Sequence, residues 1–263
     1  MRLFDADPDL ASELANDAAE DATRNAMVPA VDLAVGPWEL SELSAASDVR
    51  GEVHGFIVID GMLTVEASLG GRTCVRLLAK RELTLLDGVE MRSLPTAWSW
   101  SVLTTARLAI LDDRLLVIGR RWPRLMSALL KRAAQSSRQA MLQQAISQFP
   151  RVEDRLLALF WTVADRQGTV RPDGVFVSLP VPHRTLANMI GAQRPTVTLG
   201  LARLAEQGRL RNVEDGWLID PQSRIAFRTP TSRRSAPRFS SEPFDLSHPV
   251  RQTMAEADRQ PAA

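Results

Sequence analysis

The sequence contains a single cysteine, Cys74, and this scarcity excludes several kinds of site. One thiol cannot form an internal disulfide, and it cannot supply a multi-cysteine metal or iron–sulfur site. The chain also lacks the run of roughly 18 consecutive apolar residues that a membrane helix needs. Its first 25 residues are acidic and contain no apolar core of the kind found in a signal peptide. Together these absences predict a cytoplasmic protein with no membrane partner.

Lysine is also scarce. Lys80 and Lys131 are the only two, so almost all of the positive charge is arginine, which suits bidentate contacts with phosphate and guanine. The chain has 32 basic and 31 acidic residues and a formal net charge of +1, which is not the charge of a protein that coats DNA. Acidic residues gather near the N-terminus, whereas basic residues gather in segment 180–207 and in the C-terminal tail. This distribution is typical of a protein that binds selected DNA sequences.

The common catalytic motifs are missing as well. The sequence has no G-x-S-x-G, no phosphate-binding P-loop and no His-Glu zinc helix. The three histidines, His54, His183 and His248, lie in different segments and do not suggest one site. We therefore expect no enzymatic activity, no metal and no cofactor.

Residues 180–207 predict two short helices joined by a tight turn. The first helix stops at Gly191, where the turn needs a residue that tolerates a positive φ. Pro195 suits the first turn of the second helix, because its missing N–H would have no partner there. The spacing of Val197, Leu201 and Leu204 predicts that they form one buried stripe on this helix. The pattern is a helix-turn-helix, whose second helix inserts into the major groove of DNA.

A β-hairpin is predicted directly after these helices. Its strands are Leu210–Val213 and Trp217–Ile219, and Asp215-Gly216 between them is a strong turn signal. A helix-turn-helix followed by such a hairpin is a winged helix. The alternatives are a helical hairpin that serves stability alone and a winged helix used for protein contacts, with the N-terminal domain as a docking module.

The winged helix carries seven residues that we predict to contact double-stranded DNA. Arg194 is assigned to a guanine, because its guanidinium can donate two hydrogen bonds to one base edge. The remaining assignments place Gln193 and Thr198 near base edges, Thr196, His183 and Arg184 on phosphates, and Arg203 on the same exposed face.

Short apolar runs separated by turn-forming pairs fill residues 27–111. Strands are expected on both sides of Asp60-Gly61 and of Gly70-Gly71. Further strands are expected at Leu83–Leu86, Ala97–Leu103 and Ala106–Leu111, with a turn at Asp87-Gly88. Many short strands at spacings of roughly eight to twelve residues predict a β-sandwich or a small jelly-roll barrel.

A long helix is predicted over Trp122–Phe149, which contains no glycine and ends before Pro150. Small residues in its middle would allow two such helices to approach closely, so we interpret the helix as a dimer seam. The alternative is a helix that packs only on its own barrel. The predicted seam consists of Met126, Leu129, Ala133, Ser136, Ala140 and Gln143, close to a 3,4 spacing.

The order of these elements and the segment RTLANMIGAQRPTVTLGLARLAEQGRL are similar to those of the Crp/Fnr family of bacterial transcription regulators. The resemblance covers roughly residues 30–220. It implies a homodimer in the cytoplasm, with a cyclic-nucleotide-binding-like sensor barrel and winged helices that bind a near-palindromic operator. RNA polymerase is a further partner that the resemblance allows, and the sequence does not separate an activator from a repressor.

With this resemblance, the chain is expected to be an α+β protein of five segments. These are an acidic leader (1–26), a jelly-roll barrel (27–118), a long dimerisation helix (119–149), a winged helix-turn-helix (150–220) and a disordered tail rich in Arg, Ser and Pro (221–263). The leader is expected to be poorly ordered, either as a solvated tail or as a loosely held acidic helix.

The sequence departs from the family at the site for cyclic AMP. Members that bind this nucleotide carry a Gly-Glu pair and, further on, Arg-Ser-Ala, but here Leu85 lies near the Glu position and Pro95 at the Arg position. Without the guanidinium, the buried cyclic phosphate would have no charge partner. We predict that cyclic AMP is not the ligand and leave the effector unknown. A shifted alignment that recruits Arg92-Ser93 is the alternative, and it would make the regulator cyclic-AMP-responsive.

The other signals sensed within the family also find little support. The Fnr branch holds an iron–sulfur cluster through several cysteines, which Cys74 alone cannot do. His54 is interpreted as an ordinary strand residue rather than a haem ligand. In the recognition helix, Pro195 replaces a family Glu and Leu199 replaces a second Arg, so part of the usual contacts with C·G and G·C pairs is lost.

Overall fold

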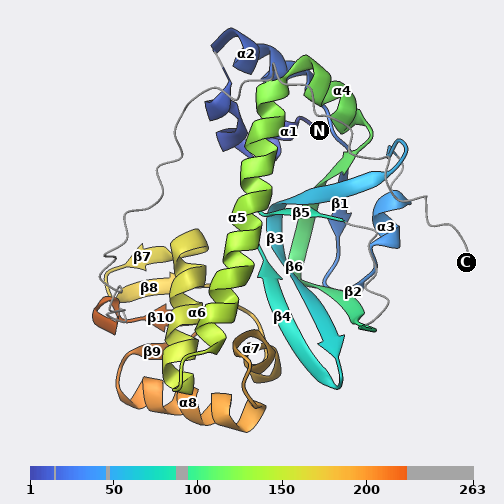
Figure 1. The fold of residues 1–263 in the computed structure, drawn as a ribbon. Helices are drawn as coiled ribbons and strands as arrows, with labels where there is room; N and C mark the ends of the chain where they lie inside the picture. Colours follow the sequence, from blue (N-terminus) through green and yellow to red (C-terminus); the bar gives the residue numbers. More distant parts are fainter. Residues whose placement is uncertain (15, 46–47, 87–93, 224–263) are drawn as a thin grey trace, which may run out of the picture. The chain divides into compact units, whose positions relative to one another are not determined.

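A computed structural model describes residues 1–14, 16–45, 48–86 and 94–223 (Figure 1). Within these ranges the N-terminal part is built on an antiparallel sheet with the strand order β1-β6-β3-β4, to which β2 is added on β6 and β5 on β3. The strands are β1 Ala30–Leu33, β2 Gly36–Trp38, β3 Val53–Leu69, β4 Arg72–Leu78, β5 Leu83–Leu85 and β6 Ala97–Asp112. The predicted α+β class with an N-terminal β domain is therefore confirmed.

The two long strands, β3 and β6, correct the predicted turn at Asp60-Gly61. The chain does not reverse there. It runs on as one strand, with register shifts on both sides of Asp60. Gly61 has a φ of +83°, and a Cβ on it would lie 2.4 Å from the carbonyl oxygen of Thr105. An Asp-Gly pair thus marks a β-bulge here rather than a hairpin. The strands predicted at 97–103 and 106–111 are likewise one strand, β6.

The Gly70-Gly71 turn is confirmed between β3 and β4, where both glycines have positive φ.

The sheet domain has an apolar core that includes Trp38 of β2 and Phe56 of β3, with the partly buried Trp100 of β6 packed against them. These rings pack edge to face, with centroids 5.8–5.9 Å apart. The aromatic cluster gives the sheet domain its own centre.

The N-terminal leader is helical and packs against the sheet domain, whereas the sequence suggested a solvated tail or a loosely held helix. The leader forms α1 (Leu3–Ala6), the 3-10 helix η1 (Pro8–Glu13) and α2 (Asn16–Asn25). Leu3 and Leu10 are fully or almost fully buried against the sheet domain and α5. Three of its acidic residues, Asp7, Asp9 and Asp21, pair with arginines that are distant in the sequence. Asp7 is completely buried and accepts hydrogen bonds from Arg132.

Two helices follow the sheet, α4 (Arg114–Arg121) and the long α5 (Pro123–Ser147). The orientation predicted for α5 is wrong. Leu129 and Ser136, both assigned to the dimer seam, are buried against their own chain. Gln143, also assigned to the seam, donates hydrogen bonds to the backbone carbonyls of Val75 and Met189. The remaining helix of this part is the short α3 (Ser41–Ser44).

The C-terminal part of the described chain begins with α6 (Val152–Gln167). A four-stranded sheet of order β7-β8-β10-β9 packs with three helices. Its elements are β7 Thr169–Arg171, β8 Gly174–Val177, α7 His183–Ile190, α8 Arg194–Glu206, β9 Leu210–Val213, β10 Gly216–Ile219 and the 3-10 turn η2 Pro221–Ser223. The segment around Pro172 forms the turn of a hairpin between β7 and β8.

The apolar core of this C-terminal part also includes residues of the N-terminal sheet. Met62 of β3 and Val75 and Leu77 of β4 belong to the same buried cluster as Leu186, on α7. The sheet and the winged helix therefore share apolar contacts.

Several predicted features lie outside the described residues: the Asp87-Gly88 turn, the Arg92-Ser93 pair and the tail beyond residue 223. Among the helices of the described chain, none has both the length and the apolar character that crossing a bilayer requires.

Candidate nucleic-acid interface

The predicted helix-turn-helix is formed by α7 and α8. Gly191 closes α7 in the left-handed conformation, with φ +64° and ψ +42°. The N–H of Ala192 then donates to the carbonyl of Ala187 at 2.9 Å, which completes the turn. A buried stripe on α8 packs this helix against α6, and it consists of the predicted Val197, Leu201 and Leu204 together with Gly200.

Gly200 allows α8 to approach α6 closely. A Cβ on this residue would lie 3.1 Å from Leu156 and 3.3 Å from Val152. Behind it, Phe160 of α6 packs on Trp217 of β10, with ring centroids 5.0 Å apart. The outer face of α8 is thus held on a rigid base, as a helix that docks into a groove requires.

The structure places most of the predicted DNA-contacting residues on the surface. Arg194, at the start of α8, is exposed, and so are four others: Arg184, Gln193, Thr196 and Thr198. His183, at the first position of α7, is half-buried.

One pair of these residues is brought together. The Nδ1 of His183 lies 3.0 Å from the Oγ1 of Thr198, which also donates to the carbonyl of Arg194 at 3.2 Å. A hydroxyl has one proton, so Nδ1–H must be the donor to Thr198. The Nε2 atom of a neutral His183 ring is then an acceptor and cannot donate to a phosphate, so the assignment of His183 to a phosphate stays a prediction.

Arg203 has a different environment from the other predicted residues. Its guanidinium donates to Glu153 of α6 at 2.9 Å. This hydrogen bond holds the pKa of Glu153 below its ordinary value. Although its side chain is about half exposed, Arg203 is paired within the chain, and its assignment to DNA stays a prediction.

Two features of the surface were not predicted from the sequence. The middle of the exposed face of α8 is apolar, since it is formed by Pro195, Leu199 and Ala202, on the side opposite the buried stripe. This apolar strip could have been deduced from the helical spacing of Val197, Leu201 and Leu204, because a buried stripe fixes which residues lie on the opposite side of the helix. The second feature is Arg211, which is exposed on β9 of the wing.

A second polar site lies where the sheet domain meets α6. Glu82, whose side chain is 3% exposed, accepts hydrogen bonds from Arg76 of β4 and from Arg166 of α6. Arg76 also donates to the hydroxyl of Ser136 on α5. The backbone N–H of Ala79 completes the shell at 3.1 Å from Glu82. We call these four side chains, Arg76, Glu82, Ser136 and Arg166, the junction cluster.

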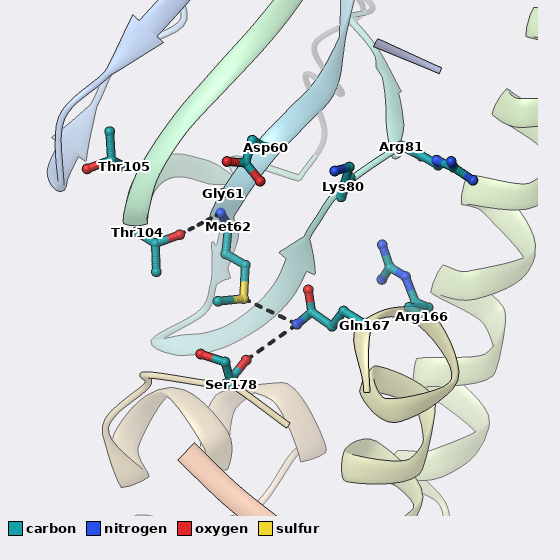
Figure 2. Close-up of a pocket in the computed structure, with 10 residues that line it drawn as sticks. All are labelled: Asp60, Gly61, Met62, Lys80, Arg81, Thr104, Thr105, Arg166, Gln167 and Ser178. Atoms are coloured by element: carbon teal, nitrogen blue, oxygen red, sulfur yellow. Dashed lines mark hydrogen bonds between the residues drawn. The ribbon is translucent and has the colours of Figure 1, made fainter. Parts of the chain in front are cut away.

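A cleft of about 750 Å³ lies beside the junction cluster (Figure 2). Its floor is the β3 bulge, where the hydroxyl of Thr104 accepts the N–H of Met62 at 2.9 Å. Lys80, Arg81 and Arg166 face it, but Arg81 is paired with Asp9 and Arg166 with Glu82. The charges lining the cleft are thus largely balanced by carboxylates of the chain. Within the described ranges, no three His, Cys, Asp or Glu side chains are grouped as metal ligands.

His54 lies in β3, as expected, and its Nε2 is 2.9 Å from a carboxylate oxygen of Asp113. This contact with a neighbouring carboxylate agrees with its interpretation as an ordinary strand residue.

Comparison with known proteins places this geometry in context. Residues 150–223 match the family described as Crp-like helix-turn-helix domain. A comparison with curated proteins finds no match. The chain is also similar to solved structures at low sequence identity, and three of them illustrate the range.

A cyclic nucleotide-binding domain containing protein from Listeria monocytogenes EGD-e is 16% identical, with a TM-score of 0.58 over 83% of this chain and 99% of that one. FixK2 from Bradyrhizobium japonicum is 14% identical, with a TM-score of 0.56 over 73% and 92%. TTHB099, a transcriptional regulator of the CRP family from Thermus thermophilus, is 18% identical, with a TM-score of 0.52 over 72% and 91%.

The domain match and the shared fold support the resemblance found in the sequence. Residues 150–223 are therefore a Crp-like helix-turn-helix domain, and the chain shares the fold of these solved structures, a sheet domain followed by helices and a helix-turn-helix.

Proposed function

We propose that this chain is a DNA-binding transcription regulator that acts in the cytoplasm as a homodimer and is not an enzyme. Its α8 helix enters the major groove, and two copies bind a near-palindromic operator. The observation that carries the proposal is the exposed Arg194 at the start of α8, in a segment that matches the Crp-like helix-turn-helix domain.

The outer face of α5 supports the dimer. Five exposed residues recur on it at alternating spacings of three and four, and three of the five are small: Ser127, Leu130, Ala134, Ser137 and Met141. Leu130 is 64% exposed and Met141 71% exposed, an unusual exposure for such large apolar side chains. We therefore move the proposed seam from the buried stripe to this outer stripe, where small residues allow a close approach.

The junction cluster supports a coupling between the sheet domain and the DNA-binding part. It ties β4 to α5 and α6 through hydrogen bonds around one buried carboxylate. A change in the sheet would act on α5, and hence on the distance between the two recognition helices of a dimer.

Cyclic AMP is not proposed as the effector. Leu85, near the position of the family's Glu, ends β5 and is 52% exposed, and Pro95 is exposed. Neither residue can pair with a cyclic phosphate. Titration calorimetry with cyclic AMP should give no heat of binding, whereas micromolar binding would favour the alternative alignment through Arg92.

The proposed function is tested by selecting genomic DNA fragments on the purified protein. The enriched duplex is then titrated with the Arg194→Ala variant. Loss of a guanine contact should cost roughly 1–3 kcal/mol of specific binding free energy and leave binding to random DNA unchanged. Arg72→Ala, at the exposed start of β4 in the sheet domain, is the matched control and should bind normally. An equal loss on selected and random DNA would contradict the guanine contact.

A winged helix that contacts protein is the second candidate, because Leu199 exposes 51% of an apolar side chain on α8. A gel shift with genomic fragments separates the two, since a protein-contact module should retard none of them.

A further inference from the structure

The recognition helix has an apolar strip where a charged surface would be expected. Pro195, Leu199 and Ala202 are exposed and lie opposite the stripe that packs on α6. With a rise of 1.5 Å per residue, the strip extends over about 10 Å, or about three base-pair steps. Exposing Leu199 to water is unfavourable in the free protein, and no contact within the described chain requires it.

Two of the polar side chains that border this strip, Thr198 and Arg203, are already engaged. The hydroxyl of Thr198 bonds to His183 and to the carbonyl of Arg194. The guanidinium of Arg203 bonds to Glu153. Arg194 is the one charged residue in the first two turns of α8, and together with Gln193 before it this leaves few donors for base edges, so hydrogen bonds alone would specify few positions of an operator.

The major groove offers one apolar group, the 5-methyl group of thymine. We propose that Leu199, together with Pro195 and Ala202, contacts thymine methyl groups, so that each half-site carries thymine at the base pairs facing this strip and guanine next to Arg194. This inference rests on the proposed function and names the class of DNA that the same site selects.

The test uses the full-length protein and the duplex enriched by selection. Each thymine of one half-site is replaced in turn by deoxyuridine, which removes the methyl group and keeps the base pairing. Wild-type protein should bind roughly fourfold more weakly at each contacted position, the ratio that corresponds to about 0.8 kcal/mol for one buried methyl group. Deoxyuridine in the spacer between half-sites should have no effect.

The Leu199→Ala variant identifies the side chain responsible. Leu199 is exposed, so the variant should fold normally, and it should bind thymine and deoxyuridine duplexes equally at the position that Leu199 contacts. Val170→Ala, which truncates an apolar side chain that is 84% exposed on β7, should keep the wild-type preference.

The outcomes separate this inference from the proposed function. A duplex that is selected and bound, but that tolerates deoxyuridine everywhere, overturns the inference and leaves the function standing. A thymine preference that persists in Leu199→Ala overturns the role of Leu199. If no duplex is enriched at all, the proposed function fails, and this inference fails with it.

Discussion

The junction cluster and the outer face of α8 place polar and apolar groups in opposite ways. At the junction, the carboxylate of Glu82 is buried among the arginines of two other elements. On α8, Leu199 is half exposed and Arg194 is the one charged side chain of the first two turns. The junction pairs its charges within the chain, whereas α8 leaves its surface open for a partner.

This difference teaches which region carries stability and which carries recognition. A buried carboxylate with two arginine partners resists change, because removing one member leaves the others unpaired in a poorly solvated site. An exposed apolar residue contributes little to the fold and becomes useful when a partner covers it. We therefore expect substitutions at the junction to affect unfolding and those on α8 to affect binding.

The largest effect is expected for Glu82→Ala. This variant leaves Arg76 and Arg166 without their carboxylate and should lower the free energy of unfolding by about 3–5 kcal/mol. Chemical denaturation measures the change. Glu52→Ala, at an exposed position of the same domain, should change stability by less than about 0.5 kcal/mol. Equal stabilities of the two variants would show that the junction contributes nothing special.

A somewhat smaller loss is expected for Leu10→Ala in the leader. Leu10 is 2% exposed, and its truncation should cost about 2–4 kcal/mol through lost burial and a residual cavity. Val35→Ala, at a residue that is 63% exposed, is the control and should be almost neutral. A neutral Leu10→Ala would restore the view of the leader as a solvated tail.

The smallest effect is expected for Arg203→Ala, at the ion pair that links α8 to α6. Arg203 is 55% exposed, so solvent screening limits the loss to less than about 1 kcal/mol. Arg203 lowers the pKa of Glu153, so the pair stabilises the fold above the ordinary value of 4.5 and loses this contribution as the pH falls through the lowered pKa. Thermal unfolding should show the full difference between variant and wild type at pH 7, and this difference should shrink as the pH is lowered below 4.5.

The contrast between regions also explains what the sequence could predict. The helix-turn-helix depends on signals within a few residues of one another, such as Gly191 at the turn and Pro195 at the start of α8. Local rules for turns and helix starts are sufficient there. The same local rules correctly predicted that Arg194 lies on the surface of the helix-turn-helix.

The parts that the sequence did not predict depend on distant partners. Asp7 is buried by Arg132, which lies 125 residues away, and Glu82 by Arg166, which lies 84 residues away. The composition indicated only an acidic leader, because no local sequence pattern predicts an ion pair between residues so far apart. The bulge at Gly61 failed for a related reason, because an Asp-Gly pair suits a hairpin and a bulge equally until the neighbouring strand is known.

The orientation of α5 shows a third limit. Its inner and outer stripes have nearly the same 3,4 spacing and similar small residues, so periodicity alone could not decide which one faces the sheet. In the structure, Gln143 identifies the inner stripe, because its amide donates hydrogen bonds to backbone carbonyls of both β4 and α7.

The apolar cluster shared by the sheet and the winged helix has a consequence for protein engineering. A fragment that begins at residue 150 would leave the surface that Met62, Val75 and Leu77 cover open to water. Such a fragment should be prone to aggregation, and a graft onto another regulator would need a matching apolar strand surface on its host. The DNA-binding segment is therefore a poor choice for modular exchange, whatever sequence it recognises.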